Sequence, residues 1–353
     1  MNQEIADGVW PTMLTPFTAD GEVDYEALDR LVEWYLEKGV DGLFAVCQSS
    51  EMFYLTTEES VRIAEFVVRK AAGRVPVIAS GHISDGFEDQ VRELNAMAGT
   101  GIDALVLITN RLAGPDESDE KLRANLERLL AELPADLPLG FYECPYPYKR
   151  LVTPELLRWC ADSGRFSFLK DTCCDADMLR DRMEAVGNSG LKIYNANTTT
   201  LLESLKLGIS GYSGVMANFH PELYVWLLRN WREKPEEAEK LLPILTMASW
   251  IEKQLYPINA KYYLMLEGVF RNFIGRSKNA EELNATFRLE VEQVRELTQN
   301  LNLAIREDKP IDMDVYAAVE TAAPAILAAE SSNQGGVLLE VSDFRKKANM
   351  NAE

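Results

Sequence analysis

Short runs of apolar residues alternate with longer segments in which apolar residues recur every three or four positions, and this pattern repeats eight times. Continuous apolar runs are typical of strands in a parallel sheet that is covered on both faces. Apolar residues three or four apart mark the buried face of a helix. The expected strands are residues 8–16, 41–46, 75–81, 103–109, 137–144, 166–172, 191–197 and 210–217. The expected helices are residues 25–39, 56–73, 86–101, 119–133, 153–164, 176–187, 198–208 and 220–231.

Eight strand–helix units in succession predict an α/β fold, a closed (β/α)8 TIM barrel over residues 8–234. A doubly wound open sheet is the structural alternative. No GxGxxG follows the first expected strand, so nothing in the sequence favours that alternative.

The pattern changes after the eighth unit. Residues 235–310 read as three helices with no strand between them, which predicts a C-terminal helical region beside the barrel. Residues 311–353 are expected to be an extension with a partly disordered tail, because Pro324 interrupts a weak helical pattern and residues 331–336 resemble a flexible linker.

Composition narrows the classes of partner. Hydrophobic residues make up 47% of the 353 residues and charged residues 26%, as in ordinary globular proteins. The net charge of −20 argues against nucleic acid and against an anionic membrane. An acidic N-terminal segment that is unlike a signal peptide, together with five cysteines without a CxxC pair, predicts a reduced cytoplasmic protein.

Lys170 is the most informative candidate for chemistry, because it lies within an otherwise apolar expected strand. In a barrel of this kind, chemistry occurs at the C-terminal ends of the strands. Desolvation can lower a lysine pKa by ~3 or more, and a neutral amine attacks a carbonyl group to form a Schiff base. The alternatives are that Lys170 pairs with Asp171 or extends to the rim. Adjacent strand residues point to opposite faces, which weakens the pairing with Asp171.

Tyr142 and the serines at positions 49 and 50 are the next candidates. Tyr142 ends the neighbouring fifth strand, where a phenol can move protons near an iminium. Ser49 and Ser50 follow the second strand and supply hydrogen-bond donors that suit a carboxylate. The alternative interpretations are a core tyrosine and an ordinary polar turn.

Other groups in the sequence carry less information. The cysteines match no metal-ligand spacing, so no metal site is expected. The glycines of residues 208–214 suit either a phosphate site, as in a barrel isomerase, or a tight turn. His82 and His220 are interpreted as structural.

Four segments carry a family resemblance: TPFTADGEVDYEALDRLVEWYLEKGVDGLFAV, CQSSE, FYECP and FLKDT. Their order and spacing resemble the dihydrodipicolinate synthase and N-acetylneuraminate lyase family over about residues 8–300. The resemblance implies a class I, pyruvate-handling aldolase on a (β/α)8 barrel. It implies that Lys170 forms the Schiff base and that Tyr142 is the general acid and base. It also implies that Ser49, with the backbone amide of Ser50, holds the carboxylate of the keto acid.

The sequence departs from the family pattern at three places. Gln48 stands where the family has a threonine that relays protons in the synthases. Asn110 and Arg111 replace the paired tyrosines expected after the fourth strand. Residues 146–148 replace the neighbourhood of an arginine that holds the second substrate of the synthases. The lysine-biosynthetic synthase activity is therefore not expected.

Together these features predict a Schiff-base-forming lyase or aldolase that acts on pyruvate or a related 2-oxo (sugar) acid. The alternatives are a non-catalytic 2-oxo-acid-binding protein on the same scaffold and a 2-oxo sugar acid dehydratase. No cofactor is expected, and the family resemblance implies a homo-oligomer, a dimer or a tetramer. Further candidates for substrate binding are Gln48, Ser213, Arg111, Asn197, Lys149 and Arg150.

Overall fold

The computed structural model describes residues 4–309. One compact unit ends at Leu303 and a second begins at Ala304. The features expected in residues 311–353, including the interruption at Pro324 and the linker at 331–336, lie outside the described residues.

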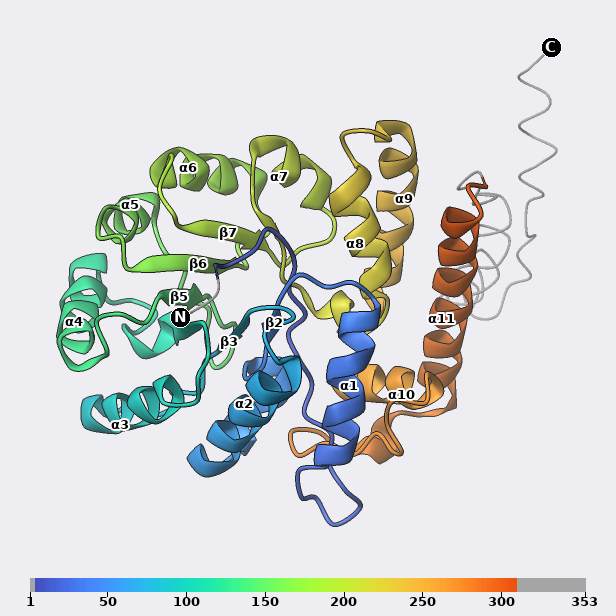
Figure 1. Ribbon diagram of the computed structural model, residues 1–353, viewed down its shortest axis with the longest axis horizontal. Helices are drawn as coiled ribbons and strands as arrows, with labels where there is room; N and C mark the ends of the chain where they lie inside the picture. The colour runs from blue at the N-terminus through green and yellow to red at the C-terminus, as the bar shows by residue number, and fades with distance from the viewer. Residues whose placement is uncertain (1–3, 310–353) are drawn as a thin grey trace, which may run out of the picture. The chain divides into compact units, whose positions relative to one another are not determined.

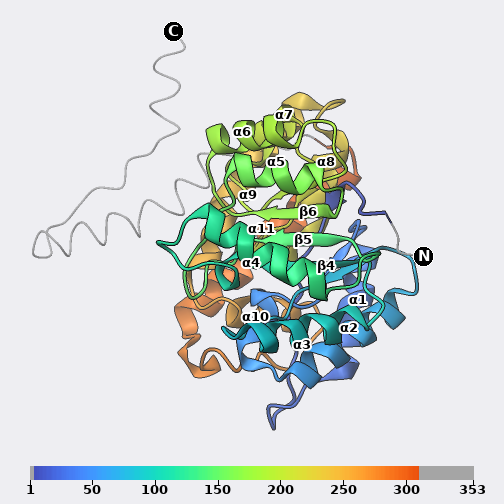
Figure 2. The ribbon, with the colours of Figure 1, turned by 90° about the vertical axis from the view of Figure 1, so that its left-hand side faces the viewer.

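Eight parallel strands form one sheet in the order β1-β8-β7-β6-β5-β4-β3-β2. A parallel bridge between Thr12 and Phe44 joins the two ends of this order, which closes the predicted TIM barrel. The strands lie at the centre of Figure 1, and Figure 2 shows β4, β5 and β6 side by side behind the helices. The strands are β1 (Gly8–Val9), β2 (Leu43–Phe44), β3 (Val77–Ala79), β4 (Ala104–Ile108), β5 (Leu139–Tyr142), β6 (Phe166–Asp171), β7 (Lys192–Asn195) and β8 (Gly211–Tyr212).

Eight helices surround the strands, each following the strand of the same number (Figure 1). Thr56 and Glu59 form a capping box at the start of α2, and Thr153 caps α5 ahead of Pro154, as their positions in the sequence suggest. The helices are α1 (Tyr25–Glu37), α2 (Thr57–Ala71), α3 (Phe87–Ala98), α4 (Asp119–Glu132), α5 (Pro154–Asp162), α6 (Ala176–Val186), α7 (Leu201–Leu207) and α8 (Pro221–Asn230).

The strands are shorter than the apolar runs that predict them. The second run spans residues 41–46, for example, but β2 contains only Leu43 and Phe44. The remaining residues of each run belong to the loops, where most of them stay buried without continuous pairing to a neighbouring strand. The ends of these runs therefore form the loops at the C-terminal mouth of the barrel.

Glycines permit the close contacts around β8. A Cβ atom on Gly211 would lie 1.9 Å from the carbonyl oxygen of Gly8, so only glycine allows β8 to pair with β1. A Cβ atom on Gly214 would lie 2.2 Å from the hydroxyl oxygen of Tyr212. Packing therefore accounts for these two glycines of residues 208–214 without a phosphate site.

The chain after the barrel is helical, with α9 (Pro235–Ala248), α10 (Ile258–Leu266) and α11 (Ala285–Arg306). A 3₁₀ segment, η5 (Ser249–Lys253), connects α9 to the turn before α10. Helix α9 packs against α7 and α8, and η5 packs against η4 (Val215–Asn218) after β8. Within residues 4–309, no helix combines the length and apolar character needed to cross a bilayer.

A buried ion pair joins this helical region to the barrel. Lys261 of α10 and Glu51, which follows β2, are fully buried and bonded to each other. Glu51 also accepts hydrogen bonds from the backbone amides of Arg276 (2.7 Å) and Ser277 (2.6 Å). The loop after β2 is therefore fixed by residues that follow it by more than 200 positions.

Candidate active site

A cavity of about 480 Å³ opens at the C-terminal ends of the strands. This volume lies within the range of ordinary small-molecule sites. Its walls come from the loops after β2, β5, β6, β7 and β8 and from the helical region. The residues that line it are Gln48, Ser49, Glu51, Phe53, Tyr54, Tyr142, Pro145, Tyr146, Lys149, Lys170, Thr172, Cys174, Ala196, Asn197, Val215, Glu252, Lys253, Tyr256, Pro257, Ser277 and Lys278.

Lys170 lies at the base of this cavity with 3% of its surface exposed. It stands directly opposite Tyr142 in the register of β5 and β6, and its Nζ atom is 4.3 Å from the centroid of the Tyr142 ring. Burial lowers the pKa of Lys170 to about 8, against smaller opposing effects of Cys47, Cys144 and Glu252. Roughly a tenth of the amine is therefore neutral at pH 7, far more than for an ordinary lysine, and nucleophilic attack requires this neutral form.

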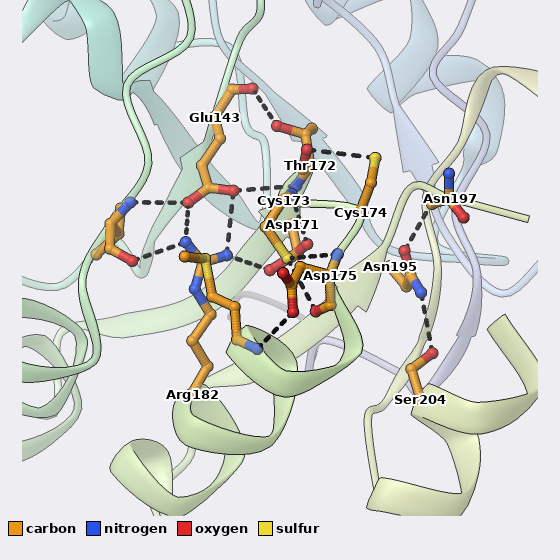
Figure 3. Close-up of polar contacts among 12 residues, drawn as sticks. Glu143, Asp171, Thr172, Cys173, Cys174, Asp175, Arg182, Asn195, Asn197 and Ser204 are labelled. Carbon is orange, nitrogen blue, oxygen red and sulfur yellow. Dashed lines mark hydrogen bonds and ion pairs between the residues drawn. The ribbon is translucent and has the colours of Figure 1, made fainter. Parts of the chain in front are cut away.

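Lys170 does not pair with Asp171, because the two side chains leave β6 on opposite faces. Asp171 is bonded to Arg182 of α6, which also binds the Glu143 carboxylate at 2.5 Å. All three side chains are fully buried. Figure 3 shows Arg182 extending from its helix toward both carboxylates. Arg182 therefore holds together the ends of β5 and β6 behind Tyr142 and Lys170.

Tyr142 is a neutral phenol at physiological pH. Burial raises its pKa well above 10, and the neighbouring thiols Cys144 and Cys47 add to this effect. Its hydroxyl donates to Oε1 of Gln48 at 3.4 Å, and the Cys144 thiol approaches the same oxygen at 3.4 Å. The amide of Gln48 thus occupies the position beside the phenol where the resemblance implies a hydroxyl group.

The two serines after β2 lie differently. Ser49 lines the cavity, and its Oγ atom accepts a hydrogen bond from the Tyr256 hydroxyl at 2.7 Å. The Ser50 hydroxyl points away and donates to the carbonyl oxygens of Met13 (2.7 Å) and Ala45 (3.0 Å). The backbone amide of Ser50 donates to the Cys47 carbonyl at 3.1 Å. Ser49 therefore faces the cavity, whereas the Ser50 side chain stabilises the turn after β2.

The remaining candidates divide between the cavity and its surroundings. Asn197 and Lys149 line the cavity, and the Lys149 Nζ atom donates to the Thr172 carbonyl at 2.7 Å. Ser213, Arg111 and Arg150 do not line it.

Burial explains the first of these exceptions, and ion pairs explain the other two. Ser213 is fully buried after β8. Arg111 pairs with Asp85 at 2.9 Å, and its guanidinium lies 5.5 Å from the ring centroid of Phe53, so it contacts the cavity wall from behind. Arg150 pairs with Asp119 at 2.6 Å.

Sequence reasoning did not identify the contribution of the helical region. Tyr256, Glu252, Lys253 and Lys278 all line the cavity, although they follow the last strand by 40 residues or more. A barrel pattern directs attention to the ends of strands, and these residues lie on a 3₁₀ segment and on loops that have no periodic signal. Only a three-dimensional structure assigns them to the site.

Among residues 4–309, no group of three or more His, Cys, Asp or Glu side chains is placed to hold a metal ion. Burial raises the pKa of the Cys144 thiol to about 11, so this thiol stays protonated at neutral pH. His82 and His220 are fully buried, and burial lowers the pKa of each to about 3. Both histidines therefore stay uncharged.

The sequence profile of the Dihydrodipicolinate synthetase family matches residues 6–281, well over half of the chain. The chain belongs to this family. Members of the family are class I aldolases and lyases, so the protein is an enzyme of the class I aldolase type that makes or breaks carbon–carbon bonds. The buried lysine beside a tyrosine is consistent with that chemistry.

Two relatives illustrate the degree of similarity. A 4-hydroxy-tetrahydrodipicolinate synthase from Jannaschia sp. is 32% identical over 216 residues, which cover 61% of this chain and 72% of the relative. A protein of the same name from Saccharophagus degradans is 27% identical over 290 residues, covering 81% of this chain and 96% of the relative.

Solved structures share the fold. A prophage protein of Escherichia coli that belongs to the dihydrodipicolinic acid synthase family, in complex with pyruvate, is 25% identical with a TM-score of 0.74, covering 84% of this chain and 99% of that one. A dihydrodipicolinate synthase from Bacillus anthracis is 19% identical with a TM-score of 0.75, covering 83% and 99%. The (β/α)8 barrel with a C-terminal helical extension, predicted from the sequence, is therefore confirmed.

Proposed function

We propose that the enzyme forms a Schiff base between Lys170 and pyruvate or a related 2-oxo acid, and then makes or cleaves a carbon–carbon bond beside the imine. The observation that carries this proposal is the buried Lys170 amine, with a lowered pKa, 4.3 Å from the Tyr142 ring in a cavity of small-molecule size. The pyruvate complex of the related Escherichia coli protein supports the choice of ligand.

The chemistry follows from the groups in the cavity. The neutral Lys170 amine attacks the ketone carbon, and a proton delivered to the carbonyl oxygen lets it leave as water, which forms the iminium. Tyr142, which is neutral and faces Lys170, is the group that donates and recovers protons. The iminium then accepts the electron pair of the breaking bond, or loses a proton from the adjacent carbon and becomes the enamine nucleophile. Ser49 would hold the carboxylate of the 2-oxo acid.

Borohydride trapping tests the proposal directly. Reduction in the presence of pyruvate should add the mass of the reduced pyruvate imine to the wild-type chain, located on the peptide that contains Lys170. The variant Lys170→Ala should gain no mass and lose activity. An unmodified wild type, or an adduct on another lysine, would refute the assignment.

A specific observation keeps one alternative open to test. The Tyr142 hydroxyl meets the amide of Gln48, and an amide is a poor proton relay. A 2-oxo-acid-binding protein without turnover is therefore the second candidate. Tyr142→Phe separates the two: an enzyme loses roughly 100-fold or more in rate, whereas a binding protein changes only its affinity, by a few-fold. The assay is turnover over a panel of aldehyde acceptors and 2-oxo sugar acids, which also tests dehydration.

A further inference from the structure

Recognition of the substrate carboxylate rests on the direction of one hydroxyl group. We propose that Asn218 and Tyr256 fix the direction of the Ser49 hydroxyl, so that Ser49 offers its proton to the carboxylate of the 2-oxo acid. The inference rests on the proposed function and assigns two positioning residues to it. Neither residue lies in the four segments that carry the family resemblance, and Tyr256 comes from the helical region.

The orientation of the Asn218 amide is determined by its neighbours. Its Nδ2 atom lies 2.8 Å from the Thr12 carbonyl oxygen, which can only accept a hydrogen bond. Its Oδ1 atom accepts from the hydroxyl of Tyr35. Asn218 and Tyr35 are fully buried, so water does not compete for these bonds. The amide nitrogen therefore faces Tyr256, and the carbonyl oxygen faces Tyr35.

This orientation makes the Tyr256 hydroxyl an acceptor on one side. The Asn218 Nδ2 atom donates to it at 2.9 Å, and the remaining proton of the phenol is directed at Ser49 Oγ at 2.7 Å. Burial raises the pKa of Tyr256, so the phenol keeps this proton over the working pH range. Tyr256 therefore donates its proton to Ser49.

The Ser49 oxygen accepts from Tyr256, so its own proton must point elsewhere. It points toward Thr12 Oγ1 at 3.1 Å, which is long for a bond between two hydroxyl groups. A carboxylate in the cavity would offer a shorter, charge-assisted bond in exchange. Ser49 thus favours an anionic acceptor. The hydrogen bonds from Asn218 to Tyr256 and from Tyr256 to Ser49 leave the Ser49 hydroxyl with its own proton to donate.

The test compares two ligands that differ only in the carboxylate. Pyruvate carries the anion and methyl pyruvate carries a neutral ester, while both keep the ketone that reacts with Lys170. Borohydride trapping measured against ligand concentration gives an affinity and a maximal rate for each. In Tyr256→Phe, the preference for pyruvate over the ester should fall roughly 10-fold, since one hydrogen bond to a charged group is weakened. The maximal trapping rate should stay within about 2-fold of the wild type.

The control variants separate orientation from packing. Tyr262→Phe removes a phenol that donates to Glu292 on α11, and it should leave the preference unchanged. Ser49→Ala should lose the preference, and adding Tyr256→Phe to it should cause no further loss, because both act through one bond. Additive losses, or a lower maximal rate with the preference intact, would overturn the proposal. If Tyr256→Phe does not fold, Asn218→Asp breaks the same chain, since a carboxylate only accepts and turns the phenol proton away from Ser49.

The outcomes also distinguish this inference from the proposed function. Absence of any adduct on wild-type Lys170 rejects the Schiff-base function itself. A normal adduct with an unchanged preference in the folded Tyr256→Phe variant rejects only the orienting role of Tyr256 and Asn218.

Discussion

Glu252 and Lys170 set the pH at which the cavity holds a free amine. Glu252 lies at the exposed mouth of the cavity and has no hydrogen-bond or ion-pair partner among residues 4–309. Its pKa is raised because burial removes part of its hydration, while Lys253 and Lys170 act in the opposite direction. In return, the Glu252 carboxylate raises the pKa of Lys170, against the larger lowering caused by burial. The carboxylate therefore keeps the amine more protonated than burial alone would.

We expect the rate of pyruvate trapping to rise with pH to a midpoint near 8, where Lys170 loses its proton, and then to level off. Glu252→Gln removes the negative charge that stabilises the ammonium form, so the midpoint should move to lower pH. The measurement is the trapping rate at subsaturating pyruvate between pH 6 and 10. Glu239→Gln, an exposed carboxylate paired with Lys206, is the control and should leave the midpoint in place. A midpoint that moves upward in Glu252→Gln would contradict the electrostatic argument.

Strands β5 and β6 act as a pair because their terminal residues alternate in direction. Tyr142 and Lys170 point into the cavity, while Glu143 and Asp171 point outward to Arg182 (Figure 3). Burial is the largest cause of the raised pKa of Glu143. The Arg182 guanidinium lowers this pKa, and the Asp171 carboxylate raises it further. The cation is what allows two carboxylates to lie in one buried cluster.

Arg182→Met should therefore destabilise the fold by about 3–5 kcal/mol at neutral pH, because it leaves buried carboxylates without a cation. The loss should be smaller at pH 5 than at pH 8, because protonation neutralises the Glu143 carboxylate, whose folded pKa lies above its unfolded value. Urea unfolding at the two pH values measures both effects. Arg180→Met on the same helix removes an exposed pair with Asp177 and should change the unfolding free energy by less than about 0.5 kcal/mol. Equal losses for Arg182→Met at both pH values would show that charge is not the cause.

The elements were predictable from the sequence because the barrel repeats one pattern eight times. Each described helix of the barrel begins within a few residues of its expected start. Lys170 was predictable for a related reason, since a lysine within an apolar run is a local anomaly. The contact between Glu143 and Arg182, 39 positions apart, leaves no comparable signal, because the helix pattern of residues 176–187 does not say which side chain faces which strand end.

The long-range parts of the site were not predictable. Tyr256 meets Ser49 across 207 positions of chain, and Asn218 meets Tyr256 across 38, through a turn whose path no periodicity describes. Ser50 was expected beside Ser49 in the site, but the 3₁₀ turn η1 (Gln48–Ser50) directs its side chain to backbone carbonyls. Alternation along a strand does not apply in such a turn.

Within residues 4–309, ion pairs link the barrel and the helical region, and they range from buried to exposed. The buried contact is between Lys261 and Glu51, and an exposed contact joins Lys206 of α7 to Glu239 of α9 at 3.2 Å. The pKa of Glu51 is lowered: burial would raise it, but Lys261 and the amide donors outweigh burial. Folding stability from this carboxylate is therefore fully present above its ordinary pKa and is lost as the pH falls through the lowered pKa of the folded state.

Lys261→Met should cost about 3–5 kcal/mol of unfolding free energy at neutral pH, because Glu51 then remains buried without its cation. Lys206→Met, which removes the exposed pair between the same two regions, should cost less than about 1 kcal/mol. Thermal and urea unfolding measure both. Similar small losses in the two variants would show that the buried pair does not hold the regions together.

The homo-oligomer implied by the family resemblance stays a prediction. Asn110, which follows β4, is bonded within its own chain: its Nδ2 atom donates to the carbonyls of Cys144, Tyr146 and Tyr148, each at 2.8 Å. Light scattering of the purified chain would measure the assembly directly.

Tyr256 and later residues form part of the cavity wall, and this affects when the cavity is completed during synthesis. During synthesis on the ribosome, all eight strands emerge before the segment that holds Ser49 in place and completes the cavity wall up to Lys278. A nascent chain can thus close its barrel while it still lacks a finished binding site. The cavity around Lys170 therefore has all of its walls only after residues up to Lys278 have left the exit tunnel.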